Sequence, residues 1–130
     1  MSQALSDLDS RFLPKAEQLL AALEAAGIHV QIITTRRTAE AQADARAHGV
    51  SWTNYSPHQD GMAIDVAPPE LMKIKNWAPE HPLWKQIGVV GCSLGLGLVW
   101  GGTWRRDAAV PYARHYDPGH FQDGDWKHVG

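Results

Sequence analysis

A histidine and an aspartate seven positions apart are the first residues of this sequence that could share one chemical task. His58 and Asp65 stand in the stretch SPHQDGMAID, with Gly61 between them. Apolar residues predict a strand over Met62 to Ala67, and a carboxylate buried in a strand is costly without a partner. Catalytic zinc usually takes three protein ligands from His, Asp or Glu, so these two side chains could be two of them. Taken alone, a surface histidine near a turn and an aspartate in an edge strand explain the pair better.

A second polar stretch, YDPGHFQ, places an aspartate three positions before another histidine. Pro118 disfavours a helix at Asp117, and Gly119 would let the backbone turn closely before a short strand over Gly119 to Gln122. Such a turn could aim two side chains at one centre, with His120 as a third ligand and Asp117 beside a bound water. The alternative is a solvated Asp-Pro-Gly turn followed by a half-buried histidine.

Together the two stretches resemble the M15 zinc peptidases. This family includes D-Ala-D-Ala carboxypeptidases and the L-alanyl-D-glutamate endopeptidases of phage endolysins and bacterial autolysins. The matching patterns are Ser-x-His-x-x-Gly-x-Ala-x-Asp at residues 56–65 and Asp-x-x-His at residues 117–120. ITTRRTAEAQ at residues 33–42 is similar to the family's Ser-Gly-Tyr-Arg-Ser segment followed by Gln. LVWGGTW at residues 98–104 resembles the Trp-Gly-Gly-x-Trp stretch of the endopeptidases, and the four blocks occur in family order.

The resemblance implies a role for each of several side chains. His58, Asp65 and His120 would bind Zn²⁺, which lowers the pKa of a bound water to about 7. Asp117 would be the general base that takes the proton of this water. Arg37 would hold a substrate carboxylate or the developing oxyanion, because its forked donors suit two oxygens. Further contacts to the substrate are predicted for three side chains: Ser56, Gln42 and Trp104.

Two departures from the family pattern lie beside these residues. Thr35 and Arg36 replace the usual glycine and aromatic residue. Arg105 to Tyr116 separate the Trp-Gly-Gly-x-Trp stretch from Asp117, where the endopeptidases have only a few residues. This insertion predicts an extra loop over the cleft.

The elements that must position these residues mix helices and strands without regular alternation, which predicts an α+β fold. Helical spacing begins near Phe12 and ends before Gly27. The remaining elements are expected over Ile28 to Thr34 (strand), Thr38 to His48 (helix), Met62 to Ala67 (strand), Leu83 to Leu94 (helix), Leu98 to Trp100 (strand) and Gly119 to Gln122 (strand). The resemblance implies a small antiparallel sheet with flanking helices, of the hedgehog and D-Ala-D-Ala peptidase type, with zinc in a central cleft.

Length and composition limit the classes of function. The 130 residues suit one domain, and we expect a monomer. A net charge of −2 without a long basic run argues against nucleic acid and anionic membrane surfaces as partners. The N-terminal residues lack a signal-peptide pattern, and no apolar stretch has the length of a membrane span. The single cysteine, Cys92, lies among apolar residues and is expected to be a buried structural thiol.

The general base favours one branch of the family. Asp117 in place of Glu, with the Trp-Gly-Gly-x-Trp stretch, favours an endopeptidase that cuts the L-Ala–D-Glu bond of the peptidoglycan stem peptide. The small size fits a phage or prophage endolysin, held in the host cytoplasm until a holin-type lesion releases it. An autolytic or wall-recycling enzyme is an alternative source of the same activity. Two other functions stay open: a D-Ala-D-Ala carboxypeptidase, and a non-catalytic module that binds zinc or the cell wall.

Overall fold

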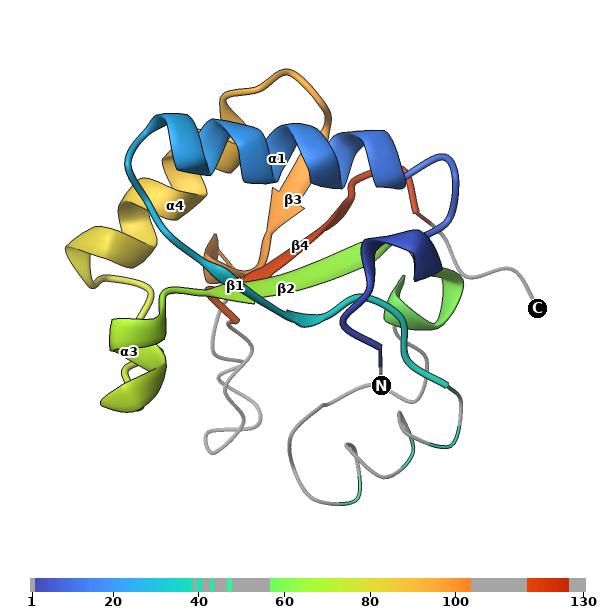
Figure 1. Cartoon of the computed structure of the whole chain (residues 1–130), viewed down its shortest axis with the longest axis horizontal. Helices are drawn as coiled ribbons and strands as arrows, with labels where there is room; N and C mark the ends of the chain where they lie inside the picture. Colours follow the sequence, from blue (N-terminus) through green and yellow to red (C-terminus); the bar gives the residue numbers. More distant parts are fainter. Residues whose placement is uncertain are drawn as a thin grey trace.

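Four antiparallel strands form one sheet in the part of the chain that this computed structural model describes, residues 2–38, 40, 43, 47, 57–103 and 117–126. The strands are β1 (Gln31–Thr34), β2 (Ala63–Ala67), β3 (Leu98–Trp100) and β4 (His120–Asp123). Their order in the sheet is β1-β2-β4-β3. The central neighbours β2 and β4 therefore bring together the two sequence stretches that carry the candidate ligands (Figure 1).

Helices α1 and α4 lie over the same side of this sheet (Figure 1). The helices have the bounds α1 (Leu13–Ala25), α3 (Pro69–Lys73) and α4 (Pro82–Cys92), and short 3-10 turns occur at η1 (Leu5–Asp7), η2 (Pro57–Asp60) and η3 (Gly101–Thr103). The helix expected over Thr38 to His48 falls mostly outside the described residues. None of the described helices approaches the roughly 20 apolar residues that crossing a bilayer takes, since the longest of them, α1, has 13 residues.

The core fills the space between these two helices and the sheet. Helical spacing in α1 turns one apolar face inward, and each fully buried aliphatic or aromatic side chain contributes about 1.5–3 kcal/mol to stability. The opposite wall consists of alternate residues of β2 and β4, whose remaining side chains point to the other face of the sheet. The fully buried residues of this core include Phe12, Ala16, Leu19, Leu23, Ile64, Val66, Trp84, Ile87 and Phe121.

The predicted α+β class and the antiparallel sheet with flanking helices are confirmed, with differences at the ends of elements. The strand expected from Ile28 begins at Gln31. Helix α3 was not predicted, because Pro68-Pro69 indicated only the end of a strand. Pro69 occupies the first turn of this helix, where its missing N–H is not needed. The single domain stays a prediction.

Cys92 does not have the buried position that its apolar neighbours predicted. Helix α4 turns Trp84, Ile87 and Gly91 toward the core, whereas Cys92 at its last position is exposed. Local composition alone cannot tell which side of a helix meets the core. Trp84 is fully buried in the core, and Trp77 stacks on it with 37 % of its surface exposed.

Candidate metal centre

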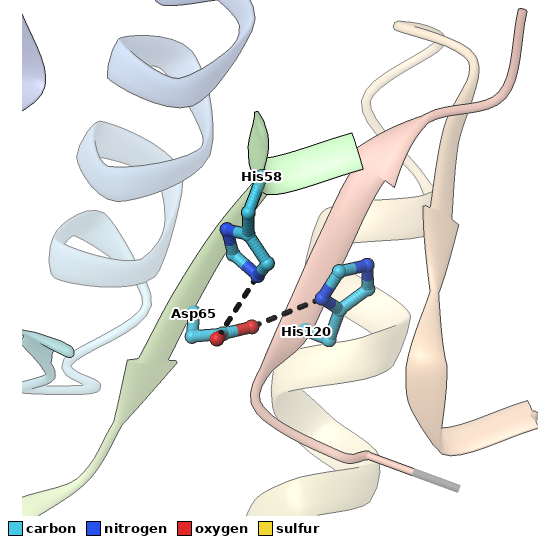
Figure 2. Close-up of side chains that lie close together, drawn as sticks. All are labelled: His58, Asp65 and His120. Atoms are coloured by element: carbon cyan, nitrogen blue, oxygen red, sulfur yellow. Dashed lines mark hydrogen bonds and ion pairs between the residues drawn. The ribbon is translucent and has the colours of Figure 1, made fainter. Parts of the chain in front are cut away.

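Two histidines converge on one carboxylate at the face of the sheet opposite helix α1. His58 Nε2 lies 3.0 Å from Asp65 Oδ2, and His120 Nδ1 lies 3.0 Å from Asp65 Oδ1. The two imidazole rings meet edge to face with 5.1 Å between their centroids, and Figure 2 shows them approaching Asp65 from two sides. The exposed fractions of the side chains are 3 % for His58, 13 % for Asp65 and 5 % for His120. The structure thus brings these three side chains together, and their role as metal ligands stays a prediction.

The register of the sheet places two of the three residues. Asp65 of β2 and His120 of β4 are direct partners across the antiparallel pair, so their side chains leave the sheet on the same face. A slip by one residue would turn either side chain into the core. Ile64 and Phe121, the fully buried neighbours in sequence, oppose such a slip. The apolar residues around Asp65 and His120 thus fix the positions of both polar side chains.

His58 comes from turn η2 just before β2. Gly61 closes this turn with φ of +68°, and a Cβ there would lie only 2.6 Å from the backbone nitrogen of Asp9. Any residue other than glycine is therefore disfavoured at position 61 for two reasons, the positive φ angle and the lack of space for a Cβ. The ring of His58 is oriented by Thr35, whose carbonyl oxygen lies 3.0 Å from Nδ1. A proton on Nδ1 donates to this carbonyl, which leaves the Nε2 lone pair facing Asp65.

Charges within the cluster change the pKa values of its members. Burial alone would raise the pKa of the Asp65 carboxyl, but the charge of His58 and the hydrogen bond with His120 hold it well below its usual range. Burial alone would lower the pKa of His120, but its hydrogen bond with Asp65 and the charges of Asp65 and Asp117 raise it. Asp65 is therefore a carboxylate at neutral pH.

Asp117 lies beside the cluster on the turn that leads into β4. Its backbone N–H donates to the carbonyl of Gly101 over 2.9 Å, and Trp100 Nε1 donates to the carbonyl of Pro118 over 2.7 Å. A Cβ at Gly101 would lie 2.3 Å from the Asp117 carbonyl oxygen, and one at Gly119 would lie 2.4 Å from the carbonyl oxygen of Val66. The two glycines therefore let this turn pack directly against β2 and the end of β3.

The surroundings of Asp117 make it a weaker acid than usual. Burial is the main cause and the negative charge of Asp65 the second, and together they raise the pKa of Asp117 to about 6. Asp117 is not part of the group of residues whose ligand atoms lie close together. A carboxyl that lies beside a possible metal position but outside the group of candidate ligands is placed to accept a proton from a water there.

Arg37 lies next to His58. Its backbone N–H donates to the His58 carbonyl oxygen over 3.0 Å, and its side chain is partly buried. This position is compatible with the predicted contact to substrate, which stays a prediction. The other predicted substrate contacts, Ser56, Gln42 and Trp104, lie outside the described residues, as does the extra loop from Arg105 to Tyr116.

Several residues that support the site were not predicted. The contact of the Thr35 carbonyl with His58 could not be predicted from a sequence motif, because every residue has a backbone carbonyl. Trp100 and Gly101 belong to a recognised stretch, but their contacts to the Asp117 turn depend on tertiary structure. Gln122 places its side-chain oxygen 2.8 Å from His120 Nε2. Its only signal in the sequence is its position two residues after a histidine in a predicted strand.

The residues present fit a catalytic zinc ion. His58, Asp65 and His120 each offer one ligand atom, and these atoms all lie within 4.8 Å of one another. Two imidazoles and a carboxylate are a donor set that zinc takes in catalytic sites, with a further position left open. The outer nitrogen of each ring faces an oxygen, from Thr35 for one and Gln122 for the other. Such partners are typical of histidines that bind metal.

An antiparallel sheet carrying two histidines, an aspartate and an adjacent second carboxyl is an arrangement expected of a metallopeptidase. The sequence model of the M15 peptidases described as D-alanyl-D-alanine carboxypeptidase matches residues 49–123. Because the match covers more than half of the chain, this protein belongs to the M15 peptidase family. A comparison with curated protein sequences gives no match.

Three solved structures illustrate the fold that this chain shares with other proteins. The Serratia marcescens L-Ala D-Glu endopeptidase ChiX has a TM-score of 0.63 at 23 % identity, over 91 % of this chain and 81 % of that one. The LD-carboxypeptidase LdcB has a TM-score of 0.62 at 13 % identity, over 89 % and 58 %. VanYB in complex with D-alanine-D-alanine has a TM-score of 0.51 at 18 % identity, over 89 % and 71 %. At these identities the likeness establishes the fold, as the resemblance predicted.

Proposed function

We propose that this protein is a zinc-dependent peptidoglycan hydrolase that cleaves the L-Ala–D-Glu bond of the stem peptide. The observation that carries the proposal is the convergence of His58, Asp65 and His120, with the carboxyl of Asp117 beside them. Membership of the M15 peptidases and the fold shared with the endopeptidase ChiX support it. The aspartate at position 117, where the carboxypeptidases resembled by this sequence carry glutamate, favours the endopeptidase branch.

The chemistry divides between the ion and the side chains. Zinc, when bound, supplies a Lewis acid that acidifies water and polarises the scissile carbonyl. His58, Asp65 and His120 would hold it and would leave a further position open for water. Asp117 accepts the proton of the attacking water and returns it to the leaving amine. A nearby cation lowers the pKa of Asp117 from its value of about 6 in the metal-free chain, so the carboxyl is ionised and ready to act at neutral pH.

Arg37 completes the proposed site on the side of His58. Its guanidinium presents paired donors, which suit a carboxylate of the substrate or the oxyanion that develops during attack. The backbone hydrogen bond between Arg37 and His58 couples the position of this donor to that of a candidate ligand. A shift of the η2 turn would therefore disturb metal binding and substrate binding together.

A second activity, D-Ala-D-Ala carboxypeptidase, is favoured by the description of the matching family model. Digestion of purified peptidoglycan with mass spectrometry of the products separates the two. New amino-terminal D-Glu, with L-Ala left on the glycan strands, is the product of the endopeptidase. Free D-Ala as the only small product would overturn our assignment and establish the carboxypeptidase. Wall binding without any released fragment, in zinc-loaded protein, would instead favour a non-catalytic module.

We further propose that the enzyme acts as a phage or prophage endolysin. The support is the resemblance to the endopeptidase branch, in which endolysins are common. Expression of the chain in a bacterial host, alone and together with a holin, tests this role. Lysis only in the presence of the holin is the expected result. Lysis by the chain alone would argue against an enzyme that waits for a membrane lesion.

A further inference from the structure

Both ring nitrogens of His120 face an oxygen. Nδ1 lies 3.0 Å from Asp65 Oδ1, and Nε2 lies 2.8 Å from the side-chain oxygen Oε1 of Gln122. A neutral histidine can bind a metal only through the nitrogen that carries no proton. The oxygen that accepts from the other nitrogen therefore decides which nitrogen is available.

The sheet gives Gln122 the space to reach this ring. Gln122 follows His120 by two positions in β4, so both side chains leave the sheet on the same face. Its partners across the sheet are Ala63 of β2 and Val99 of β3. Ala63 has only a methyl group, which leaves room for the Gln122 amide to lie along the face toward His120.

The two histidines present different ring nitrogens to Asp65. His58 directs Nδ1 outward to the Thr35 carbonyl, and its Nε2 faces Asp65. His120 directs Nε2 outward to Gln122, and its Nδ1 faces Asp65. The outer partner of His58 is a backbone oxygen, which every residue at position 35 would supply. The outer partner of His120 is a side chain, so only here does the sequence choose the acceptor.

We propose that Gln122 is a positioning residue, which holds His120 with its proton on Nε2 and thereby presents Nδ1 to the metal. The inference rests on the proposed zinc site and assigns a function to a residue outside its ligands and its general base. Removal of the Gln122 oxygen takes away the acceptor that faces Nε2, so that the ring could turn or move its proton to Nδ1. Loss of such an outer partner typically costs about 10–100-fold in metal affinity.

Three variants test the proposal through metal affinity. Gln122→Met keeps the length of the side chain and removes the acceptor, and Gln122→Glu keeps an acceptor. Gln31→Met makes the same exchange at an exposed position, the first residue of β1. Zinc affinity is measured by competition with a chromophoric chelator, and circular dichroism checks the fold. We expect Gln122→Met to bind zinc about 10–100-fold more weakly, with Gln122→Glu and Gln31→Met close to wild type. Equal affinity of Gln122→Met and wild type would overturn the proposal.

The nitrogen that binds the metal gives a second, independent readout. Long-range ¹H–¹⁵N spectra of the zinc-loaded wild type should show the proton of His120 on Nε2 and that of His58 on Nδ1. A proton on Nδ1 of His120 in zinc-loaded protein would overturn the role of Gln122 and leave the zinc site intact. Failure of the wild type to bind zinc at all would overturn the proposed function first, and this inference with it. If Gln122→Met does not fold, the spectra of wild type and Gln122→Glu still decide the question.

Discussion

The candidate ligands and the candidate base are held in place by different means. Asp65 and His120 are fixed by the backbone ladder between β2 and β4, with core residues on the opposite face to set the register. Asp117 sits on a turn that is held by the Trp100 indole and by a few backbone hydrogen bonds, and that packs closely only because two glycines lack side chains. A ladder resists single substitutions, whereas a turn packed on glycine does not. Metal binding and proton transfer should therefore fail separately when the two regions are mutated.

The largest effect is expected for His120→Ala, which removes a ligand from the ladder region. The purified wild type should carry about one zinc per chain, given three protein ligands in one site, and the variant should lose most of it together with activity. Elemental analysis after dialysis measures the occupancy. His29→Ala removes an exposed histidine before β1 and serves as the control. Full zinc occupancy in His120→Ala would show that the ligand assignment is wrong.

Asp117→Asn should abolish turnover while the metal stays. The amide keeps the shape of the side chain but cannot accept the proton, and loss of a general base typically lowers kcat about 10²–10⁴-fold. Turnover on purified wall fragments and zinc content are measured on the same preparation. Loss of zinc along with activity would place Asp117 among the ligands and remove the distinction between the two regions.

Gly101→Ala tests the turn without touching a reacting group. The new Cβ would lie 2.3 Å from the Asp117 carbonyl oxygen and 3.1 Å from the Cβ of His120, so the turn must move. A misplacement of about 1 Å can cost up to about 10²-fold in rate. We expect a lower kcat than wild type but a higher one than Asp117→Asn, with most of the zinc retained. Wild-type kcat in this variant would show that the turn adjusts at little cost.

Arg37→Lys should produce a smaller loss, confined to the use of substrate. Lysine keeps the charge but loses the paired donors, so the fall should appear in kcat/KM with zinc content unchanged. Arg11→Lys provides a matched control, because Arg11 is exposed and pairs with Asp9 on the surface. An unchanged kcat/KM in Arg37→Lys would exclude a bidentate contact between Arg37 and the substrate.

Much of the site could be predicted from the sequence because its signals are local. The histidines, the aspartates and Gly61 occur at spacings set by one strand and one turn, and the strand pattern around Asp65 indicates which face it occupies. The contacts of Gln122, the Thr35 carbonyl and Trp100 connect positions that only the folded sheet brings together. The prediction that Cys92 is buried was wrong for the same reason, since apolar neighbours in sequence do not reveal which side of α4 faces solvent. Local pattern therefore selected the candidate ligands and the candidate base, and tertiary contacts determine which residues support them.

The smallest effect should appear in the stability of the metal-free protein. Burial and the charge of Asp65 raise the pKa of Asp117 from 3.8 to about 6, so the folded chain binds a proton there more tightly than the unfolded chain. The unfavourable charge is absent below about pH 4, develops as pH rises from there, and is fully present above about pH 6. Asp117→Asn carries no charge at this position at any pH.

Thermal unfolding of both proteins in the presence of a chelator measures this difference. Above pH 6 the variant should be more stable than wild type, by up to roughly 3 kcal/mol for a rise in pKa from 3.8 to about 6. The gain should shrink toward zero as pH falls below 4, where Asp117 becomes protonated in both folded and unfolded wild type. Asp125→Asn, an exposed carboxylate after β4, should show no such trend. A stability difference between Asp117→Asn and wild type that does not change with pH would contradict this prediction. It would mean that the charge of Asp117 does not destabilise the folded chain.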